Sequence, residues 1–293
     1  MSEVDPIQLS SSPGSSDSGA AWWIREAILA TGLVILLLSS MWIATGTFPP
    51  MVVVESKSMM HDEDGDGIAE ASIGTIDPGD LVLVMSPERA EVVTFVESTD
   101  ESSEDYGYES HGMPGDVIIY RKNGGSETPV IHRALLEVKH NQSGGWDVPG
   151  TTLRNVETVT LTLDYECTSF HRENYQLTIE DWEPSNEGYL TAGDNNLRND
   201  CMIDQPSANS RQGMGLSDSS GHPVLVVKHE WVVGVASSEI PWIGAIKLLT
   251  SGSEGDVTSS SWTNLTLTIA LILASPIIFE SASAALKQSE EEE

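Results

Sequence analysis

Basic residues are scarce in this chain. Of its 293 residues, 14 are Lys or Arg and 45 are Asp or Glu, so the formal net charge is -31 at pH 7. Phosphate binding requires clustered Lys and Arg, so nucleic acid is not expected as a partner. A surface this acidic stays soluble through charge repulsion and hydration, which suits a salty medium. Stability that did not rise with added salt would contradict this expectation.

Cysteine is also scarce, and several common site motifs are absent. Cys167 and Cys201 are too few for a disulfide scaffold or a cysteine zinc site, and the sequence leaves open whether they are bridged. The seven histidines form no HExxH-like pair, and there is neither a G-x-S-x-G elbow nor a phosphate-binding glycine loop. The acidic loop 62–66 opens like a calcium site, but Ile73 stands where the bidentate Glu belongs. We therefore expect no metal and no organic cofactor.

Two long uncharged segments lie near the two ends of the chain. Within residues 25–47, the stretch Ala27 to Gly46 supplies about the twenty apolar residues that span a bilayer. A second candidate span covers residues 257–280 and contains Pro276, which should kink the helix. These segments predict a two-pass protein with the lipid bilayer as a partner, although a cleaved signal peptide is the alternative for the first segment.

The flanking charges give the predicted orientation. Arg25 and Lys287 are the basic residues near the terminal flanks and favour both termini in the cytoplasm. The predicted layout is a disordered cytoplasmic tail at 1–24, an extracytoplasmic domain at 48–256 and an acidic cytoplasmic tail at 281–293. The expected location is the cell membrane, with the large domain outside.

The domain between the two segments is predicted to be mostly β. Short β-branched runs alternate with Gly, Asp and Ser turns, and helical periodicity is scarce. Three insert-like polar regions are expected at about 98–113, 139–187 and 203–221. The expected strands are 52–57, 80–85, 91–97, 116–121, 129–138, 157–164, 175–180, 188–191 and 223–236.

The stretch from Val52 to Asp62 contains two serines that point to chemistry. If the strand pleat continues through it, Ser56 and Ser58 face the same way and Lys57 faces the other. Two hydroxyls would then share one side of one site. A serine-containing edge strand that leaves a membrane helix is the alternative interpretation.

Four short motifs follow Ser58 in order. They are D-P-G-D at 77–80, G-D at 115–116, V-I-H-R at 130–133, and G-D-N-N at 193–196 with Asp200 and Asp204 beyond. The order is Ser, His, Asp. A serine hydroxyl becomes a good nucleophile when a base takes its proton and a carboxylate orients that base. Each motif alone is an ordinary turn or strand end, so the prediction depends on the ordered set.

Together these motifs resemble the archaeal and endoplasmic-reticulum branch of the type I signal peptidases. That family carries S-x-S-M around its nucleophile, a P-G-D turn, an I-H-R segment where bacterial members have lysine, and G-D-N-N with a second Asp six residues beyond the first. The W-V-V-G segment at 231–234 and the apolar residues after it also resemble the family. Ser56, Ser58 and Met59 match S-x-S-M, residues 78–80 match P-G-D, and residues 131–133 match I-H-R. The last motif is matched by Asp194, Asn195 and Asn196, with Asp200 as the second Asp.

The resemblance implies a signal-peptidase-like β domain with a serine endopeptidase site. Ser58 would be the nucleophile, His132 the base and Asp200 the group that orients His132. Asp194 would either support its loop or be the third member itself. The Ser58 backbone N–H and the Ser56 hydroxyl would bind the oxyanion.

By the same resemblance, the substrates are signal peptides of secretory preproteins. They would pair as an extended strand beside residues 52–56, with Val54, Met59 and Ile131 as walls of the binding pockets. The protein-export channel is a further expected partner.

Alternatives remain for the base and for the function. His61 stands where the family motif often has proline and is a second candidate base, but His132 matches the family position. Lys57 is a poorer candidate because neighbouring side chains on a strand diverge. Lys139 is a poorer candidate because it lies beyond the matching strand. A non-catalytic membrane-tethered β domain, or a related peptidase that acts on pilin-like precursors, would also carry these elements.

Overall fold

The computed structural model describes residues 16–61, 71–169, 172–196, 201–206 and 215–291. The chain divides into two compact units, residues 1–44 and 45–293, and each is described by itself. The first unit is built on helix α1 (Ser16–Thr45), so helix begins before the predicted boundary at residue 25. Residues 1–15 of the predicted tail and the acidic loop 62–66 lie outside the described residues.

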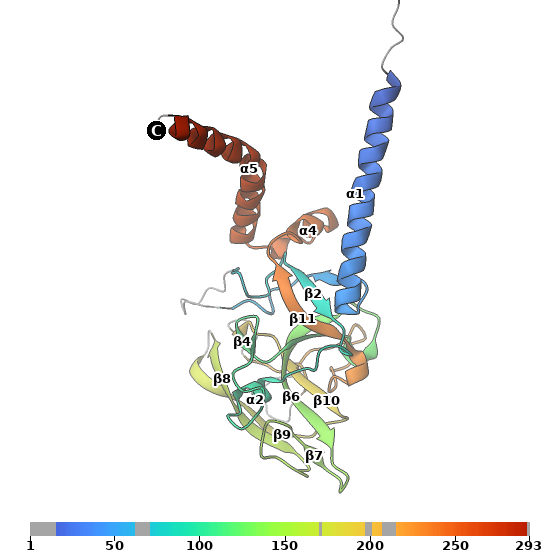
Figure 1. Ribbon diagram of the computed structural model, residues 1–293. Coiled ribbons are helices and arrows are strands. Elements are labelled where there is room, and N and C mark those ends of the chain that lie inside the picture. The colour runs from blue at the N-terminus through green and yellow to red at the C-terminus, as the bar shows by residue number, and fades with distance from the viewer. Residues whose placement is uncertain (1–15, 62–70, 170–171, 197–200, 207–214, 292–293) are drawn as a thin grey trace, which may run out of the picture. The chain divides into compact units, whose positions relative to one another are not determined.

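In the part of the chain that the structure describes, two helices are long and apolar enough to cross a membrane. They are Ala21–Thr45 within α1 and Ser259–Glu280 within α5 (Ser259–Glu291). Figure 1 shows α5 bending along its length, as expected for a helix that contains Pro276. The helix continues through most of the predicted tail at 281–293. These helices are consistent with a membrane protein, and the side on which each terminus lies stays a prediction.

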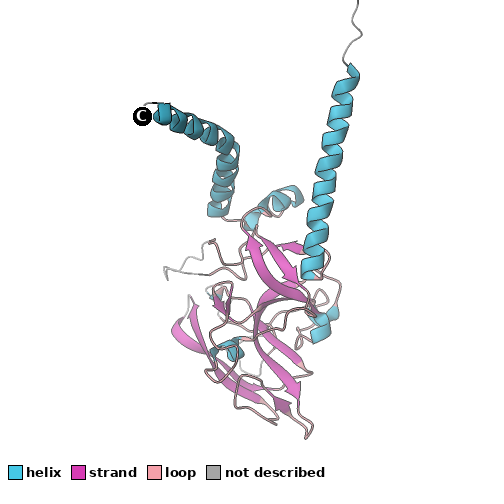
Figure 2. Cartoon of the chain, in the orientation of Figure 1, coloured by secondary structure: helices cyan, strands magenta, loops and turns pink. Residues whose placement is uncertain are grey.

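The second unit is rich in β structure, as the sequence predicts, and Figure 2 shows its strands in magenta. Its main sheet has seven strands in the order β1-β2-β11-β5-β6-β10, with β7 pairing with β6, and all of these pairs are antiparallel. The strands are β1 (Met51–Val53), β2 (Leu81–Met85), β5 (Val117–Tyr120), β6 (Val130–His140), β7 (Trp146–Asp147), β10 (Gly188–Ala192) and β11 (Val232–Ile240).

Smaller elements surround this sheet. Two further antiparallel pairs are formed by β3 with β4 and by β8 with β9. The remaining elements are α2 (Phe95–Thr99), β3 (Glu109–Ser110), β4 (Met113–Pro114), η1 (Lys122–Gly124), β8 (Val159–Ser169), β9 (Arg172–Trp182), η2 (His229–Trp231), α4 (Ala245–Ser251) and η3 (Glu254–Asp256).

The predicted strand at 91–97 is wrong, because a short helix, α2, begins inside it. Thr94 caps this helix: its hydroxyl accepts from the Glu97 N–H at 3.4 Å, and the Glu97 carboxylate accepts from the Thr94 N–H at 3.0 Å. This reciprocal pair is a capping box, which satisfies two free N–H groups at a helix start. The predicted strand at 223–236 is also displaced, because β11 begins at Val232.

The predicted polar insert at 139–187 contributes to the core of the domain. Its β8–β9 hairpin buries Leu163, Tyr165 and Ile179 against other apolar side chains. Leu135 and Leu136 of β6 belong to the same cluster, so the hairpin covers one face of the main sheet. The region is therefore a structural part of the domain.

Candidate active site

The serine stretch forms a turn directly after the edge strand β1. The strand ends at Val53, earlier than predicted, and the chain turns at Lys57 to Met59. The Oγ atoms of Ser56 and Ser58 nevertheless lie 3.1 Å apart, within hydrogen-bond distance. The two hydroxyls share one side of the chain, as predicted, although a turn rather than a continued pleat brings them together.

The G-D-N-N turn holds this serine turn in place. The Asn195 backbone N–H donates to the Ser58 carbonyl at 2.9 Å, and the Asn195 side-chain amide donates to the Lys57 carbonyl at 2.6 Å. A third link joins His61 Nε2 to the Asp194 carboxylate at 3.0 Å. Two segments far apart in the sequence are therefore fixed against each other at Ser58.

His132 lies on β6 with its ring buried, and its partner is Asp204. The distance from His132 Nδ1 to Asp204 Oδ2 is 2.7 Å, and that to Oδ1 is 2.9 Å. Asp200, which the sequence analysis places in this role, lies outside the described residues. A hydrogen bond from Nδ1–H to the carboxylate leaves Nε2 as the nitrogen that accepts a proton.

Two hydroxyl groups orient the Asp204 carboxylate. Oδ2 accepts from Tyr120 Oη at 2.8 Å and from Thr191 Oγ1 at 2.6 Å. Complete burial, and after it the charge of Asp204, raises the pKa of Tyr120 well above its usual value, so this phenol stays a donor. His132 Nδ1 and these two hydroxyls therefore converge on one buried carboxylate.

Gly193 brings the serine turn and His132 together. A Cβ atom at Gly193 would lie 2.6 Å from the Ser58 carbonyl oxygen and 3.0 Å from His132 Nε2. Both groups therefore pack against the same glycine. The Ser58 and Ser56 hydroxyls share a hydrogen bond in which either can be the donor, and proton transfer requires the Ser58 hydroxyl to donate toward Nε2. Catalytic hydrogen bonds are often loose before the substrate binds.

Replacing Gly193 by alanine should damage the site. The added methyl group would be closer to the Ser58 carbonyl than real Cβ contacts allow, so the serine turn or His132 must shift. We expect a stability loss of about 1–3 kcal/mol and a fall in serine reactivity of about a hundredfold. Urea denaturation and the rate of labelling by a fluorophosphonate probe measure the two effects. Labelling at the wild-type rate would contradict the contact.

Asp194 belongs to a different ion pair. Its carboxylate bonds to Arg133 Nη2 at 2.6 Å and Nε at 3.0 Å, and to His61. Burial alone would raise the pKa of Asp194, but the Arg133 charge and the bonds from His61 and Arg133 lower it to about 2. These bonds favour the supporting role for Asp194, which stays a prediction. Arg133 also donates to the carbonyls of Ser110, Met113, Pro114 and Gly115.

A groove of about 890 Å³ opens at the two serines. Its lining includes the polar residues Ser56, Ser58 and His132 and the apolar residues Val54 and Ile131. Val54 and Ile131, which the sequence analysis predicts as pocket walls, line this groove, and their contact with a substrate stays a prediction. A groove of this size admits an extended peptide segment whose backbone approaches the serine turn.

Met59 is not a wall of this groove. Its side chain is 1% exposed and packs inside the domain with Ile76 and Val82. The turn at Ser58 directs the next side chain into the core, because β1 has already ended. The prediction for Met59 is therefore corrected to a core position that anchors the serine turn.

The P-G-D turn hydrogen-bonds to the residue that directly follows β1. The Gly79 N–H donates to the Val54 carbonyl at 3.0 Å, and Val54 N–H donates to the Asp80 carbonyl at 3.0 Å. Gly79 has φ +100°, which glycine adopts without strain. The turn thereby fixes the strand end from which the serine turn departs.

Asp80 in this turn should give stability a marked pH dependence. Burial raises its pKa from 3.8 to about 7, although the N–H groups of Trp242 and Asp77 act against the shift. The folded state then binds the Asp80 proton more tightly than the unfolded state does. The stability that this proton contributes is full below pH 4 and is lost as pH rises through 7. The stability advantage over Asp80→Asn should shrink by about 2–4 kcal/mol between pH 4 and pH 8. Urea denaturation at both pH values tests this, and a constant difference would contradict it.

Comparisons with known proteins give no family assignment. No protein-family model matches the chain, and no curated protein matches it. Among the described residues, no group of three or more His, Cys, Asp or Glu side chains is arranged to hold a metal ion. The assignment of chemistry therefore depends on the geometry of the serine, histidine and aspartate.

Proposed function

We propose that this protein is a membrane-bound serine endopeptidase that removes signal peptides from exported preproteins. One observation carries the proposal: His132 bonds to Asp204 through Nδ1, while its Nε2 and the Ser58 turn pack against Gly193. The ordered resemblance to type I signal peptidases supports the choice of substrate. The catalytic domain would lie outside the cytoplasm, next to the export channel.

The reaction would proceed by acyl transfer to Ser58. His132 Nε2 takes the hydroxyl proton as Ser58 Oγ attacks the scissile carbonyl, and it then gives that proton to the leaving amine. A water molecule, deprotonated by the same nitrogen, hydrolyses the acyl-enzyme and frees Ser58. Asp204 holds the imidazole in the required tautomer throughout.

Two donors are available for the oxyanion. The Ser58 backbone N–H lies at the turn, and the Ser56 hydroxyl lies 3.1 Å from Ser58 Oγ. When Ser58 turns toward His132, the Ser56 hydroxyl is released to donate to the developing negative charge. Such donors stabilise the transition state in a site from which water is excluded.

The edge strand β1 provides a backbone template for the substrate. In the order of the main sheet it is a terminal strand that pairs with β2, so its other edge can pair with an extended peptide. Val52 and Val54 line the groove along this edge. The substrate backbone would run along β1 toward Ser58 and present small side chains to the apolar walls.

The chain length between α1 and the nucleophile also supports a membrane-bound substrate. Twelve residues separate Gly46 from Ser58, which is at most about 40 Å when fully extended. If α1 crosses the bilayer, this chain length would keep Ser58 within that distance of the membrane surface. The cleavage site of a signal peptide emerges at that level, next to its own apolar helix.

The proposal is tested by incubating the purified full chain in detergent with a secretory preprotein. The expected result is one cut directly after the signal peptide, identified by mass spectrometry of both products. A matched preprotein with a large side chain on the acyl side of the cleavage site should remain intact. Failure to cut any preprotein with an intact signal peptide would favour a non-catalytic β domain. Cutting only pilin-like precursors would favour the related peptidase.

A further inference from the structure

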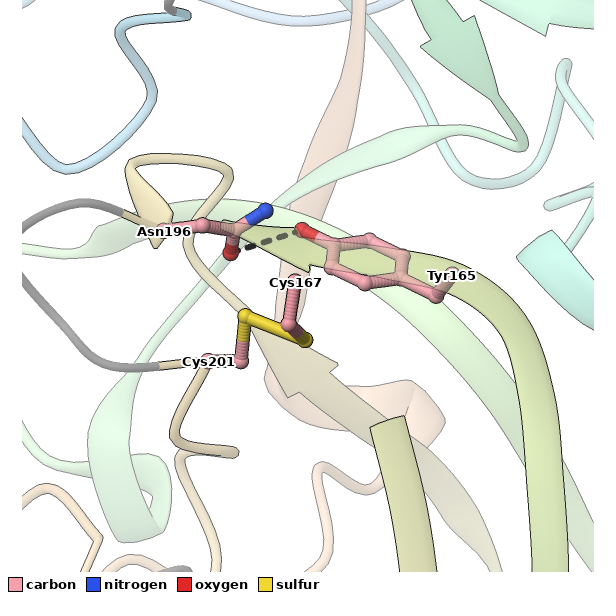
Figure 3. The surroundings of a disulfide bond; sticks show 4 residues. All are labelled: Tyr165, Cys167, Asn196 and Cys201. Carbon is pink, nitrogen blue, oxygen red and sulfur yellow. Dashed lines mark hydrogen bonds between the residues drawn. A yellow bond between two sulfur atoms is a disulfide. The ribbon is translucent and has the colours of Figure 1, made fainter. Parts of the chain in front are cut away.

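The two cysteines form a disulfide that joins the β8–β9 hairpin to the segment containing Asp204. Cys167 lies on β8, and Cys201 lies three residues before Asp204. Figure 3 shows the bond between them. Both side chains are buried, with exposed fractions of 0% and 2%. The bridge is therefore a core feature close in sequence to the carboxylate that binds His132.

The segment around Asp204 is held on its other side by β10. Ile203 forms a β-bridge with Ala192, and the Asp204 N–H donates to the Thr191 carbonyl at 2.8 Å. Backbone pairing sets the register of Asp204 beside Thr191. The disulfide holds the same short segment three residues earlier, at Cys201, so two separate constraints act on it.

The hairpin also contacts the turn that holds Ser58. Tyr165 of β8 donates from its hydroxyl to Asn196 Oδ1 at 3.1 Å (Figure 3). Asn196 directly follows Asn195, which bonds to the carbonyls of the serine turn. One strand thus reaches both the Asp204 segment, through a covalent bond, and the serine turn, through a hydrogen bond.

We propose that the Cys167–Cys201 disulfide is a positioning device that places Asp204 against His132 and makes peptidase activity depend on oxidation. The inference rests on the proposed function, since it assigns regulation to the same site. Bond formation removes two protons and two electrons from the thiols. An external disulfide oxidant takes up both through thiol–disulfide exchange and becomes a dithiol. The site would then be completed only after the domain has left the reducing cytoplasm.

The short distance along the chain makes the anchor effective. Three residues span at most about 10 Å, so a fixed Cys201 limits how far Asp204 can move from the hairpin, and the backbone pairing with β10 then sets its position. Displacing a catalytic group by about 1 Å costs about a hundredfold in rate. A disulfide that only constrained the unfolded chain would instead raise stability without affecting the rate of the folded enzyme.

The first test replaces both cysteines, Cys167→Ser and Cys201→Ser, in the full chain. We expect kcat for preprotein cleavage to fall about a hundredfold, while KM changes by less than about twofold. In the proton spectrum of histidine-labelled protein, the downfield His132 Nδ1–H signal should weaken or disappear. Each single replacement should match the double replacement, because either one removes the bond. Tyr165→Phe, which keeps the disulfide, serves as the matched control and should retain the signal.

A double-mutant cycle separates positioning from general stability. If the disulfide acts through Asp204, removing it from Asp204→Asn protein should cost less than about twofold more activity. Additive losses would overturn the proposal, as would an unchanged kcat or a doubly substituted protein that does not fold. If wild-type protein cuts no preprotein, the proposed function fails, while the effect of the disulfide on the His132 signal still decides the positioning role.

Discussion

Replacing Ser58 by alanine should abolish preprotein cleavage and leave the fold intact. The side chain is only half-buried. The backbone carbonyls of the turn accept the hydrogen bonds that hold it, and alanine keeps these carbonyls. Loss of the nucleophile removes the acyl-enzyme route, so we expect kcat/KM to fall by at least about 10⁴-fold. Single-turnover cleavage with purified protein measures this fall, and urea denaturation should give the wild-type midpoint.

Ser56→Ala provides the matched control for this experiment. It removes a neighbouring hydroxyl of the same size but leaves the nucleophile, so the expected loss is about 10²–10³-fold in kcat, as for one oxyanion donor. Equal losses in both variants would contradict the separate roles assigned to the two hydroxyls. Undiminished cleavage by purified Ser58→Ala would rule out Ser58 as the nucleophile.

The choice of base is tested in the same assay. His132→Ala should lose as much activity as Ser58→Ala, because His132 Nε2 takes the hydroxyl proton in the proposed relay. His61→Ala should retain cleavage above that level, since its Nε2 bonds to the Asp194 carboxylate. Greater dependence on His61 than on His132 would reverse the assignment.

The sequence predicts the strands of the main sheet more accurately than it predicts the elements that surround the sheet. Short β-branched runs locate β2, β5, β6 and β10 closely, because these strands are buried and bounded by turn residues. The α2 helix was missed although Thr94 and Glu97 have the spacing of a capping box. The valines before it favoured a strand. The role of the β8–β9 hairpin in the core depends on long-range packing, which a local pattern does not reveal.

In the site, too, local sequence patterns predict some residues, whereas others depend on long-range packing. The resemblance selects Ser58 and His132, and the structure brings both to one groove. The resemblance does not select Asp204. The position of Asp204 next to His132 depends on the β-bridge between Ile203 and Ala192 beside β6. Tyr120 and Thr191, which orient the carboxylate, occupy ordinary strand positions with no distinctive motif. The buried pair between Arg133 and Asp194 is likewise set by tertiary packing.

Asp194, Asp200 and Asp204 should respond differently to replacement by asparagine. Asp204→Asn should lower kcat by about 10⁴-fold with little change in KM, because an amide donor facing Nδ1 favours the wrong imidazole tautomer. Asp194→Asn should instead cost about 3–5 kcal/mol of stability, because the buried Arg133 charge loses its partner. Because Asp204 bonds to His132 Nδ1, Asp200→Asn should lower kcat less than Asp204→Asn does.

Kinetics and denaturation of all three variants separate the orienting role from the supporting one. The distinction follows from geometry: His132 Nδ1 has Asp204 Oδ2 at 2.7 Å, whereas the Asp194 carboxylate is already shared by Arg133 and His61. Loss of kcat at normal stability in Asp204→Asn supports the relay. The same loss in Asp200→Asn, with Asp204→Asn unaffected, would transfer the orienting role to Asp200. Unfolding of Asp204→Asn would mean that its three hydrogen bonds serve the fold more than the reaction.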